Sequence, residues 1–330
     1  MSSLLWFDDK VDERNALVSD VAEKLGLDLI VARSKSDASI SSWTEAVLQH
    51  STDDVALILM DHSLADSGNN PFSTGASLCM ALRSVLKGVP IVGLSASSRE
   101  DIRAEECEEY TEFIQLGNIK DCIASLKVIV EGFSMLRSLP KEEVGRQVKA
   151  IFNTPNDDDI FQRIVPLEIM SRIPIEVSHA LYRWFRDVLF KFQGPLVDGD
   201  MIAASIGAKK TFFDKDIAPL IKDETYTGVF AGLNGPRYWR DATFAHLADI
   251  VEDDGSIELS HYIDEFDKTH AYRELCFVCK KPHTEVIANE EQSVDCKKKH
   301  ALHFRCAEPA NLPHPNYFDP MYVVLGGVIR

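Results

Sequence analysis

The 330-residue chain is acidic, with 52 Asp and Glu residues against 35 Lys and Arg residues and a net charge of -17. Its hydrophobic content of 45% and charged content of 26% are typical of a globular protein with two or three hydrophobic cores. Because a negative field repels phosphate backbones and anionic membranes, the charge argues against nucleic-acid and membrane partners and favours a protein partner or a small ligand.

The N-terminal residues lack the basic segment and the long apolar run of a secretory signal peptide. No apolar stretch approaches the ~18 residues that a membrane-spanning helix needs. We therefore expect a soluble, cytoplasmic protein.

Short apolar runs alternate with stretches of helical period over residues 1–133. The predicted strands are Leu4–Phe7, Leu27–Ala32, Val55–Met60, Val89–Leu94 and Thr111–Leu116. The predicted helices are Asn15–Lys24, Ser42–His50, Gly75–Leu86 and Ile119–Phe133. The third strand is apolar at every position, as is typical of a strand buried on both faces. This alternation predicts an α/β domain with a doubly wound, parallel five-stranded sheet.

Acidic and hydroxyl side chains follow three of these strands. Asp8 and Asp9 follow the first, Asp61 follows the third and Ser95 follows the fourth. Because ligands of an open α/β sheet bind at the carboxyl ends of its strands, we expect these side chains to meet at one edge. Converging carboxylates repel one another and favour Mg2+, a hard cation with oxygen ligands. A carboxylate beside such an ion can attack a phosphoryl group and form an acyl phosphate. The competing interpretation is that the aspartates only terminate their strands.

Four segments, Leu4–Asp9, Leu59–Leu64, Gly75–Arg83 and Ile91–Ala96, resemble the CheY-like receiver domain of bacterial response regulators. They occur in the family's order, and the resemblance covers about residues 1–133. It implies that Asp61 is the phosphoacceptor, that Asp8, Asp9 and Asp61 bind magnesium, and that Ser95 is the switch hydroxyl. It also implies a histidine-kinase-like protein partner.

The chain departs from the family's pattern in two places. The loop His62–Thr74 is longer than the family's usual turn. The family's fifth strand ends in Lys-Pro, whereas this chain has Gln115, Leu116 and Gly117, and Lys120 is not at the matching position. The missing lysine removes an ion pair to the phosphoryl oxygens, so the resemblance points to an atypical receiver or a pseudo-receiver.

Residues 134–272 are dominated by helical patterns. After Pro174, apolar residues at helical spacing predict one buried stripe: Ile173, Val177, Leu181, Trp184 and Val188. A second amphipathic helix is predicted over Ile257–Phe266. We interpret the aromatic-basic clusters Arg183–Arg186 and Arg237–Arg240 as core aromatics flanked by solvated arginines. Nothing in this mainly α-helical segment has the spacing of a catalytic site.

Cysteine and histidine crowd together near the C-terminus, in the pattern Cys276-x2-Cys279, Cys296-x3-His300-x2-His303-x2-Cys306. In a chain expected to be cytoplasmic, such crowding indicates a metal site rather than disulfides. Zinc takes four sulfur or nitrogen ligands in a tetrahedron, and a C-x2-C loop presents two sulfurs to one ion. With four protein ligands the site would be structural and closed.

We expect the zinc ligands to be Cys276, Cys279, His303 and Cys306, with Cys296 and His300 as alternatives. A cysteine pair, a hairpin and the His303-x2-Cys306 pair in a helical turn resemble a treble-clef module and the first half of a RING finger. The final Cys-x2-Cys of a RING finger is absent, which argues against a second ion and against ubiquitin-ligase activity. The nearby lysines, Lys280, Lys281 and Lys297–Lys299, are interpreted as compensation for the thiolate charge.

The sequence thus predicts a receiver-like domain over residues 1–133, a helical domain over 134–272 and a zinc-binding module over 273–330. We expect a signal-transduction protein that acts through protein–protein interaction, with phosphorylation at Asp61. The alternatives are a zinc-containing DNA-binding transcriptional regulator and a constitutive interaction scaffold. No nucleophile–base pattern supports an enzyme.

Overall fold

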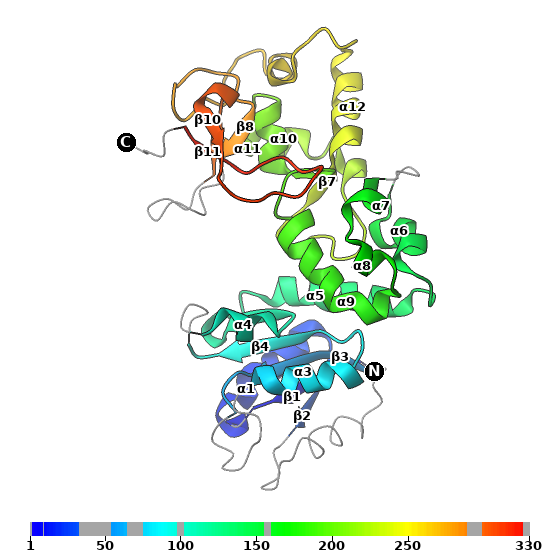
Figure 1. The fold of residues 1–330 in the computed structure, drawn as a ribbon. Coiled ribbons are helices and arrows are strands. Elements are labelled where there is room, and N and C mark those ends of the chain that lie inside the picture. The colour runs from blue at the N-terminus through cyan, green and yellow to red at the C-terminus, as the bar shows by residue number, and fades with distance from the viewer. Residues whose placement is uncertain are drawn as a thin grey trace. The chain divides into compact units, whose positions relative to one another are not determined.

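The computed structural model describes residues 2–8, 10–32, 54–64, 75–97, 102–154, 160–288 and 299–325. The chain forms two compact units, Met1–Thr154 with Pro166–Arg183 and Pro155–Val165 with Trp184–Arg330 (Figure 1). The domain limits drawn from the sequence remain predictions, because compactness does not show independent folding. Within the described ranges, no helix has both the length and the apolar character that crossing a membrane requires.

The first unit is built on a five-stranded parallel sheet with the order β2-β1-β3-β4-β5. Its strands are β1 (Ser3–Phe7), β2 (Asp28–Ala32), β3 (Val55–Asp61), β4 (Ile91–Ser95) and β5 (Glu112–Gln115). This is the strand order of doubly wound flavodoxin-like sheets. The predicted fold class and all five predicted strands are therefore confirmed.

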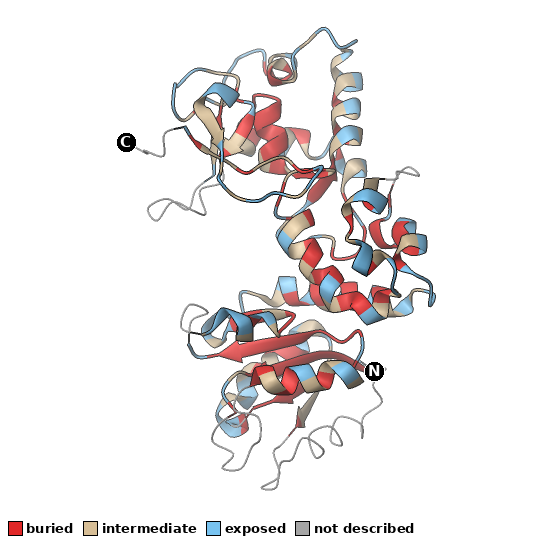
Figure 2. Cartoon of the chain, in the orientation of Figure 1, coloured by how far each residue is buried: buried red, intermediate tan, exposed pale blue. Residues whose placement is uncertain are grey.

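Helices cover both faces of this sheet (Figure 1). Leu4 and Trp6 of β1 pack with α1 (Val11–Leu25) and α5 (Ile123–Ser138). Leu5 and Phe7 point the other way and pack with α3 (Gly75–Val85). Burial on both faces explains why the three central strands β1, β3 and β4 lack polar alternation and are buried at every position, whereas the edge strands β2 and β5 are partly exposed (Figure 2). The predicted helix Ser42–His50 lies outside the described residues. Helix α4 (Ala104–Glu108) was not predicted, because five mostly acidic residues give no apolar period.

Three further helices belong to the first unit: α6 (Val144–Phe152), α8 (Leu167–Met170) and α9 (Pro174–Trp184). Helix α9 carries the predicted apolar stripe, with Val177 and Leu181 buried. It packs against the amino end of β5, where His179 Nδ1 lies 2.9 Å from Thr111 Oγ1. The Tyr182 hydroxyl donates to the carboxylate of Glu112 at 2.9 Å. This contact is at the end of the sheet opposite to the strand-end aspartates.

The second unit combines short helices with a two-stranded antiparallel sheet. Its elements before the Cys/His region are α7 (Ile160–Ile164), a π-helical turn (Phe185–Leu189), β6 (Leu196–Asp198), α10 (Gly199–Ser205), α11 (Lys210–Phe212), a second π-helical turn (Phe213–Ile217), β7 (Arg237–Trp239), α12 (Arg240–Val251) and α13 (Ile263–Phe266). The mainly helical character is as predicted. The strand pair was missed, and the predicted helix Ile257–Phe266 is instead a 3-10 turn (Leu259–His261) followed by α13.

The C-terminal part of the second unit is a four-stranded sheet with the order β10-β11-β8-β9. Its strands are β8 (Val286–Ala288), β9 (His300–Leu302), β10 (Ala307–Pro309) and β11 (Tyr322–Val324). Strands β8 and β9 pair antiparallel. The hairpin that the sequence predicts joins Thr284–Ile287 to Ser293–Cys296, and the second of these segments lies outside the described residues. Among the described residues of this part, the buried apolar core comprises Cys276, Val286, Ala288, Leu302 and Val324.

Candidate functional site

The predicted acidic site is at the carboxyl edge of the first sheet. Asp8 follows β1 and Asp61 ends β3, and these strands are neighbours, so both carboxylates reach the same edge. Each residue is only 3% exposed. Asp9 lies outside the described residues.

An arginine of α1 lies between the two carboxylates. Nη1 of Arg14 is 2.9 Å from Asp8 Oδ2 and 2.7 Å from Asp61 Oδ2. Asp8 is also oriented by the backbone N–H of Lys10, which donates to its Oδ1 at 2.6 Å. One guanidinium nitrogen therefore provides the positive charge shared by two buried acids. The sequence interpretation did not identify Arg14.

Burial dominates the electrostatics of this site. It raises the pKa of Asp61 to about 6, and the charge of Asp8 acts in the same direction, while Arg14 opposes both. Burial alone would lower the pKa of Arg14, but the two carboxylates outweigh it and raise that pKa. At neutral pH the site therefore holds an ionised Asp61 and a permanently charged arginine.

The two carboxylates also suit a magnesium ion, because hard cations take oxygen ligands of this kind. Nη1 of Arg14 contacts Oδ2 of both aspartates. A magnesium ion that used these two oxygens would require the guanidinium to withdraw.

The predicted switch hydroxyl lies on the neighbouring strand. Ser95 ends β4, is 7% exposed, and accepts a hydrogen bond from the backbone N–H of Ser97 at 3.1 Å. It is in register with Gln115 of β5. The next residue, Leu116, packs into the apolar cluster under α1 and α5. Among the described residues, the ion-pair partner of Asp61 is thus Arg14 rather than a lysine after β5.

A polar group beside Asp61 was not anticipated from the sequence. His62 Nδ1 lies 3.2 Å from the Tyr110 hydroxyl, and His62 Nε2 lies 3.2 Å from a carboxylate oxygen of Glu106. Burial lowers the pKa of His62 despite the opposing charge of Glu106. The Tyr110 ring lies against Gly93, where a Cβ would be 2.7 Å from the ring. A glycine within this apolar strand was therefore the sequence feature that could have indicated a closely packed side chain here.

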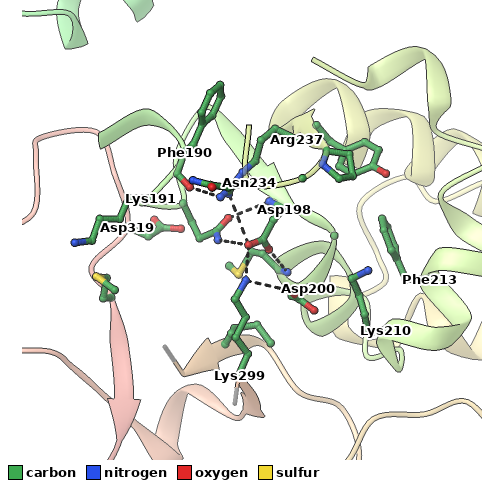
Figure 3. A pocket seen from close by; sticks show the side chains of 18 of the residues that line it. Phe190, Lys191, Asp198, Asp200, Lys210, Phe213, Asn234, Arg237, Lys299 and Asp319 are labelled. Atoms are coloured by element: carbon green, nitrogen blue, oxygen red, sulfur yellow. Dashed lines mark hydrogen bonds and ion pairs between the residues drawn. The ribbon is translucent and has the colours of Figure 1, made fainter. Parts of the chain in front are cut away.

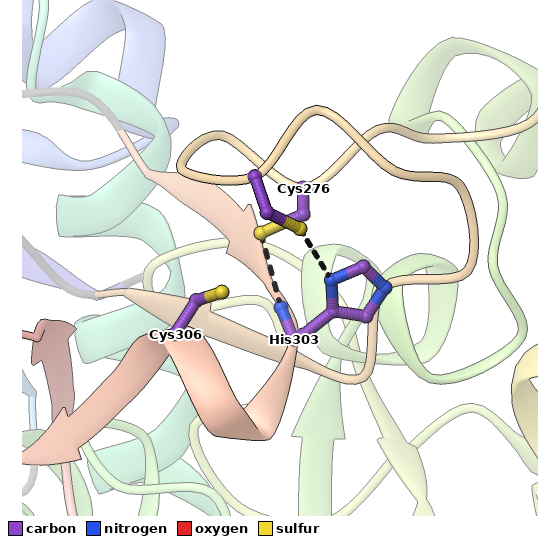
Figure 4. A group of neighbouring side chains, drawn as sticks. Cys276, His303 and Cys306 are labelled. Carbon is purple, nitrogen blue, oxygen red and sulfur yellow. Dashed lines mark hydrogen bonds between the residues drawn. The ribbon is translucent and has the colours of Figure 1, made fainter.

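A second cluster lies in the C-terminal module. The side chains of Cys276, Cys279, His303 and Cys306 bring their ligand atoms within 4.8 Å of one another (Figure 4). Tetrahedral zinc with ordinary bond lengths separates its ligand atoms by about 3.5 to 3.8 Å. Cys279 Sγ is 3.1 Å from His303 Nδ1, which is slightly closer than that. The chemistry and spacing of the four donors therefore fit a zinc ion.

Local backbone geometry prepares this cluster. The Cys276 and Cys279 turn is closed by the Lys280 N–H, which donates to the Cys276 carbonyl at 2.9 Å, with Lys280 at φ 59°. The Nε2–H of His303 donates to the Pro282 carbonyl at 2.9 Å, which leaves Nδ1 to face the sulfurs. A partner of this kind commonly fixes the tautomer of a metal-binding histidine.

The thiols respond differently to this environment. Burial alone would raise the pKa of the Cys276 thiol. The backbone N–H groups of Cys279 and His303 donate to this sulfur and outweigh burial, so the pKa is lowered. The pKa of Cys306 is raised, first by burial and then by the neighbouring thiols. Without a cation, the cluster therefore favours the thiolate of Cys276 and disfavours that of Cys306.

The alternative ligands have different positions. Cys296 lies outside the described residues. His300 is in β9, where its ring stacks on Phe277 with centroids 3.8 Å apart, and it is not among the four residues of the cluster. The predicted helical turn after His303 is a single 3-10 turn, Phe304–Cys306, that leads directly into β10.

No protein-family model matches the chain, and no curated protein matches it. Solved structures match its N-terminal part. A sensor protein from Polaromonas sp. JS666 is 22% identical over 40% of this chain and 98% of its own, with a TM-score of 0.31. A Francisella response-regulator receiver domain is 19% identical over 40% and 98%, with a TM-score of 0.30. The Thermotoga maritima response regulator TrrA, solved with Mg2+ and BeF, is 18% identical over 38% and 99%, with a TM-score of 0.28.

The first unit has the receiver fold. This conclusion follows from its own sheet order, 2-1-3-4-5, and from the placement of Asp8, Asp61 and Ser95 at the carboxyl edge.

Proposed function

We propose that the chain is a signalling protein that acts by binding another protein rather than by catalytic turnover. Its receiver unit is atypical, because Arg14 occupies the point between Asp8 and Asp61 that a magnesium ion would take. That single contact carries the proposal. A receiver whose cation is part of the chain is held in one state until something displaces the arginine.

Phosphorylation at Asp61 is part of this proposal. The carboxylate oxygen of Asp61 would attack the phosphorus of a donor, and the donor's leaving group would depart with the electron pair, leaving an acyl phosphate. A bound magnesium ion would neutralise the phosphoryl oxygens. Asp8 would hold that ion and Ser95 would donate to a phosphoryl oxygen. A donor of this class is a phosphohistidine protein or a small acyl phosphate, so we propose a histidine-kinase-like partner.

The second unit has a supporting role in this proposal. Cys276, Cys279, His303 and Cys306 hold one structural zinc ion, with no open position for a substrate. The ion stabilises a sheet whose buried core consists of only a few side chains.

The experiment combines magnesium titration with acetyl phosphate treatment of the full chain. Asp61→Asn removes the nucleophile, Arg14→Gln removes the competing cation, and Arg103→Gln is the matched control because its side chain is 77% exposed. Calorimetry measures the magnesium affinity, and intact mass measures the phosphoryl group.

We expect Arg14→Gln to bind magnesium at least tenfold more tightly than the unchanged chain and to gain the phosphoryl group faster. Arg103→Gln should behave as the unchanged chain, and Asp61→Asn should gain no phosphoryl group. Equal magnesium affinities in the unchanged chain and Arg14→Gln would contradict the proposed competition. If no variant gains phosphate and the chain still co-purifies with a protein, the remaining function is a constitutive scaffold. The observation that favours it is the absence of a lysine from Gln115–Gly117.

A further inference from the structure

A cavity of about 570 Å3 lies within the second unit (Figure 3). Its walls come from the strand pair β6–β7, the start of α10, the turn around Phe213 and the sheet of the Cys/His module. Its volume is within the range of pockets that bind small molecules, roughly 300–1,000 Å3. Neither the acidic site nor the proposed zinc site uses it.

The floor of the cavity contains an ionic group of two largely buried residues, Asp198 and Arg237, and the half-exposed Lys299. Asp198 and Arg237 are paired across β6 and β7. Lys299 is the residue before β9, and its Nζ lies 2.9 Å from Asp198 Oδ2. Figure 3 shows the three side chains pointing toward one another. Burial would raise the pKa of Asp198, but Lys299 and Arg237 outweigh it and lower that pKa. The aspartate is therefore ionised and already neutralised.

Arg237 has hydrogen-bonding capacity that the chain does not use. The residue is 6% exposed, and its Nη2 donates to the Phe190 carbonyl. Among the described residues, its Nε and Nη1 have no hydrogen-bond acceptor, and the nearest Asp198 oxygen is 3.6 Å from Nη1. Buried guanidinium N–H groups are normally paired, so these two mark a place for an acceptor. The sequence interpretation of Arg237 as a solvated arginine was wrong, because it sits in a short buried strand.

The acidic side chains of the wall, in contrast, each contact a cation, and two of them share Lys299. The pairs are Asp198 with Lys299, Asp200 with Lys299, Asp214 with Lys210 and Asp319 with Arg240. At the rim, exposed Lys191 has no ion-pair partner within the described part of the chain. The groups of the wall that remain unpaired are thus hydrogen-bond donors and one positive charge. This is unusual in a chain of net charge -17.

We infer that this cavity binds a small organic anion, whose phosphate or carboxylate oxygens accept hydrogen bonds from Arg237 and face the amine of Lys299. An oxyanion meets both needs, since it accepts several hydrogen bonds and supplies the missing negative charge. The size of the cavity leaves room for an organic body beyond the oxyanion. Lys299 adjoins β9, so the ligand would contact both the strand pair and the Cys/His sheet.

The test uses three probes with one carbon skeleton: glycerol 3-phosphate, glycerate and glycerol. Calorimetry on the full chain at constant ionic strength measures their affinities. The first two distinguish a phosphate from a carboxylate ligand, and glycerol reports binding without an anion. Asn234 lies on the cavity wall with φ 60°, a conformation that aspartate also tolerates. Asn234→Asp therefore introduces a negative charge with little change of shape.

We expect saturable binding of at least one charged probe and none of glycerol. Asn234→Asp and Lys299→Gln should each weaken that binding at least tenfold, with melting curves confirming that both variants fold. The matched controls Asn311→Asp and Lys222→Gln change exposed residues away from the cavity and should keep the affinity of the unchanged chain. Equal affinity for glycerol, no saturable binding of either anion, or no effect of the two cavity variants would each overturn the inference.

Discussion

The two clusters of acidic and thiol groups differ in where their positive charge comes from. At the receiver edge, two buried carboxylates share one nitrogen of Arg14, which belongs to the same chain. At the Cys/His cluster, four donor atoms converge, and none of the described salt bridges brings a lysine or arginine to them. From this comparison we expect the cluster with a built-in counter-charge to fold without metal, and the cluster without one to depend on an ion from solution.

Metal removal should produce the largest effect, because the described residues of the Cys/His sheet include few buried side chains. Structural zinc commonly contributes about 10 kcal/mol or more to the folding of small modules. We expect a strong chelator to release one zinc ion and to abolish hydrogen-exchange protection in β8 and β9, while the receiver sheet keeps its protection. Cys306→Ala should lose zinc, and Cys122→Ala, in the first unit, should keep it. A chain that contains no zinc, or is unchanged by chelation, would contradict this dependence.

Removing the built-in cation should have the next largest effect. Arg14→Gln leaves two buried carboxylates without their partner, and breaking such a pair costs about 3 kcal/mol. Urea denaturation should show this loss in the absence of metal, and added magnesium should restore part of it. The exposed control Arg103→Gln should change the free energy of unfolding by less than about 0.5 kcal/mol. Equal losses in the two variants would show that Arg14 is not the counter-charge.

A third way of burying a titratable group is to keep it neutral, as at His179. Burial, reinforced by Arg83 and Arg183, lowers its pKa to about 3. Below the ordinary pKa of 6.5 the unfolded chain binds a proton that the folded chain does not, so stability is full above pH 6.5 and falls as the pH decreases. The slope is about 1.4 kcal/mol per pH unit.

Between pH 6.5 and pH 5, the unchanged chain should therefore lose about 2 kcal/mol more stability than His179→Gln. Denaturation at the two pH values measures the difference. His270→Gln changes an exposed histidine and should keep the full slope. A slope that is the same in His179→Gln and the unchanged chain would mean that this histidine is protonated in the folded state.

The smallest effect on stability is expected at Asp198. Its counter-charge, Lys299, also belongs to the chain but is half exposed. The Lys299 side chain is 44% exposed, so Lys299→Gln should cost only about 1 kcal/mol. Thermal melts in low salt measure it, and high salt should shrink the difference. A loss as large as that of Arg14→Gln would place Asp198 in the same class as the receiver carboxylates.

Local pattern was enough to predict much of the fold. The apolar run Val55–Met60 identified a buried strand, and parallel pairing then placed Asp8 and Asp61 at one edge. The spacing of Cys276 and Cys279 predicted a turn that brings them together for a similar reason. That turn is closed by one backbone hydrogen bond between residues four apart, from Lys280 to Cys276. In both cases the deciding interactions are short in sequence or repeat regularly.

The remaining features depend on how helices are rotated and on which distant residues meet, and no local sequence pattern encodes either. Arg14 is one of several charged residues on α1, and only the helix's rotation against the sheet sends it to Asp61. Arg237 lies in a three-residue strand, too short to show a period. The cavity joins Asp198 to Lys299, 101 residues apart, so its donors could not be recognised as a group from the sequence.

Gly93 has a consequence for which substitutions the receiver unit can accept. Any side chain there would push into the Tyr110 ring, and at Gly75 a Cβ would lie 2.7 Å from the same residue's hydroxyl. In a library of all single substitutions, these two glycines should be depleted as strongly as core leucines, although neither has a side chain that packs. Intolerance at Gly93 would report the position of the Tyr110 ring, and intolerance at Gly75 the close approach of the Asp61 carbonyl and the Tyr110 hydroxyl.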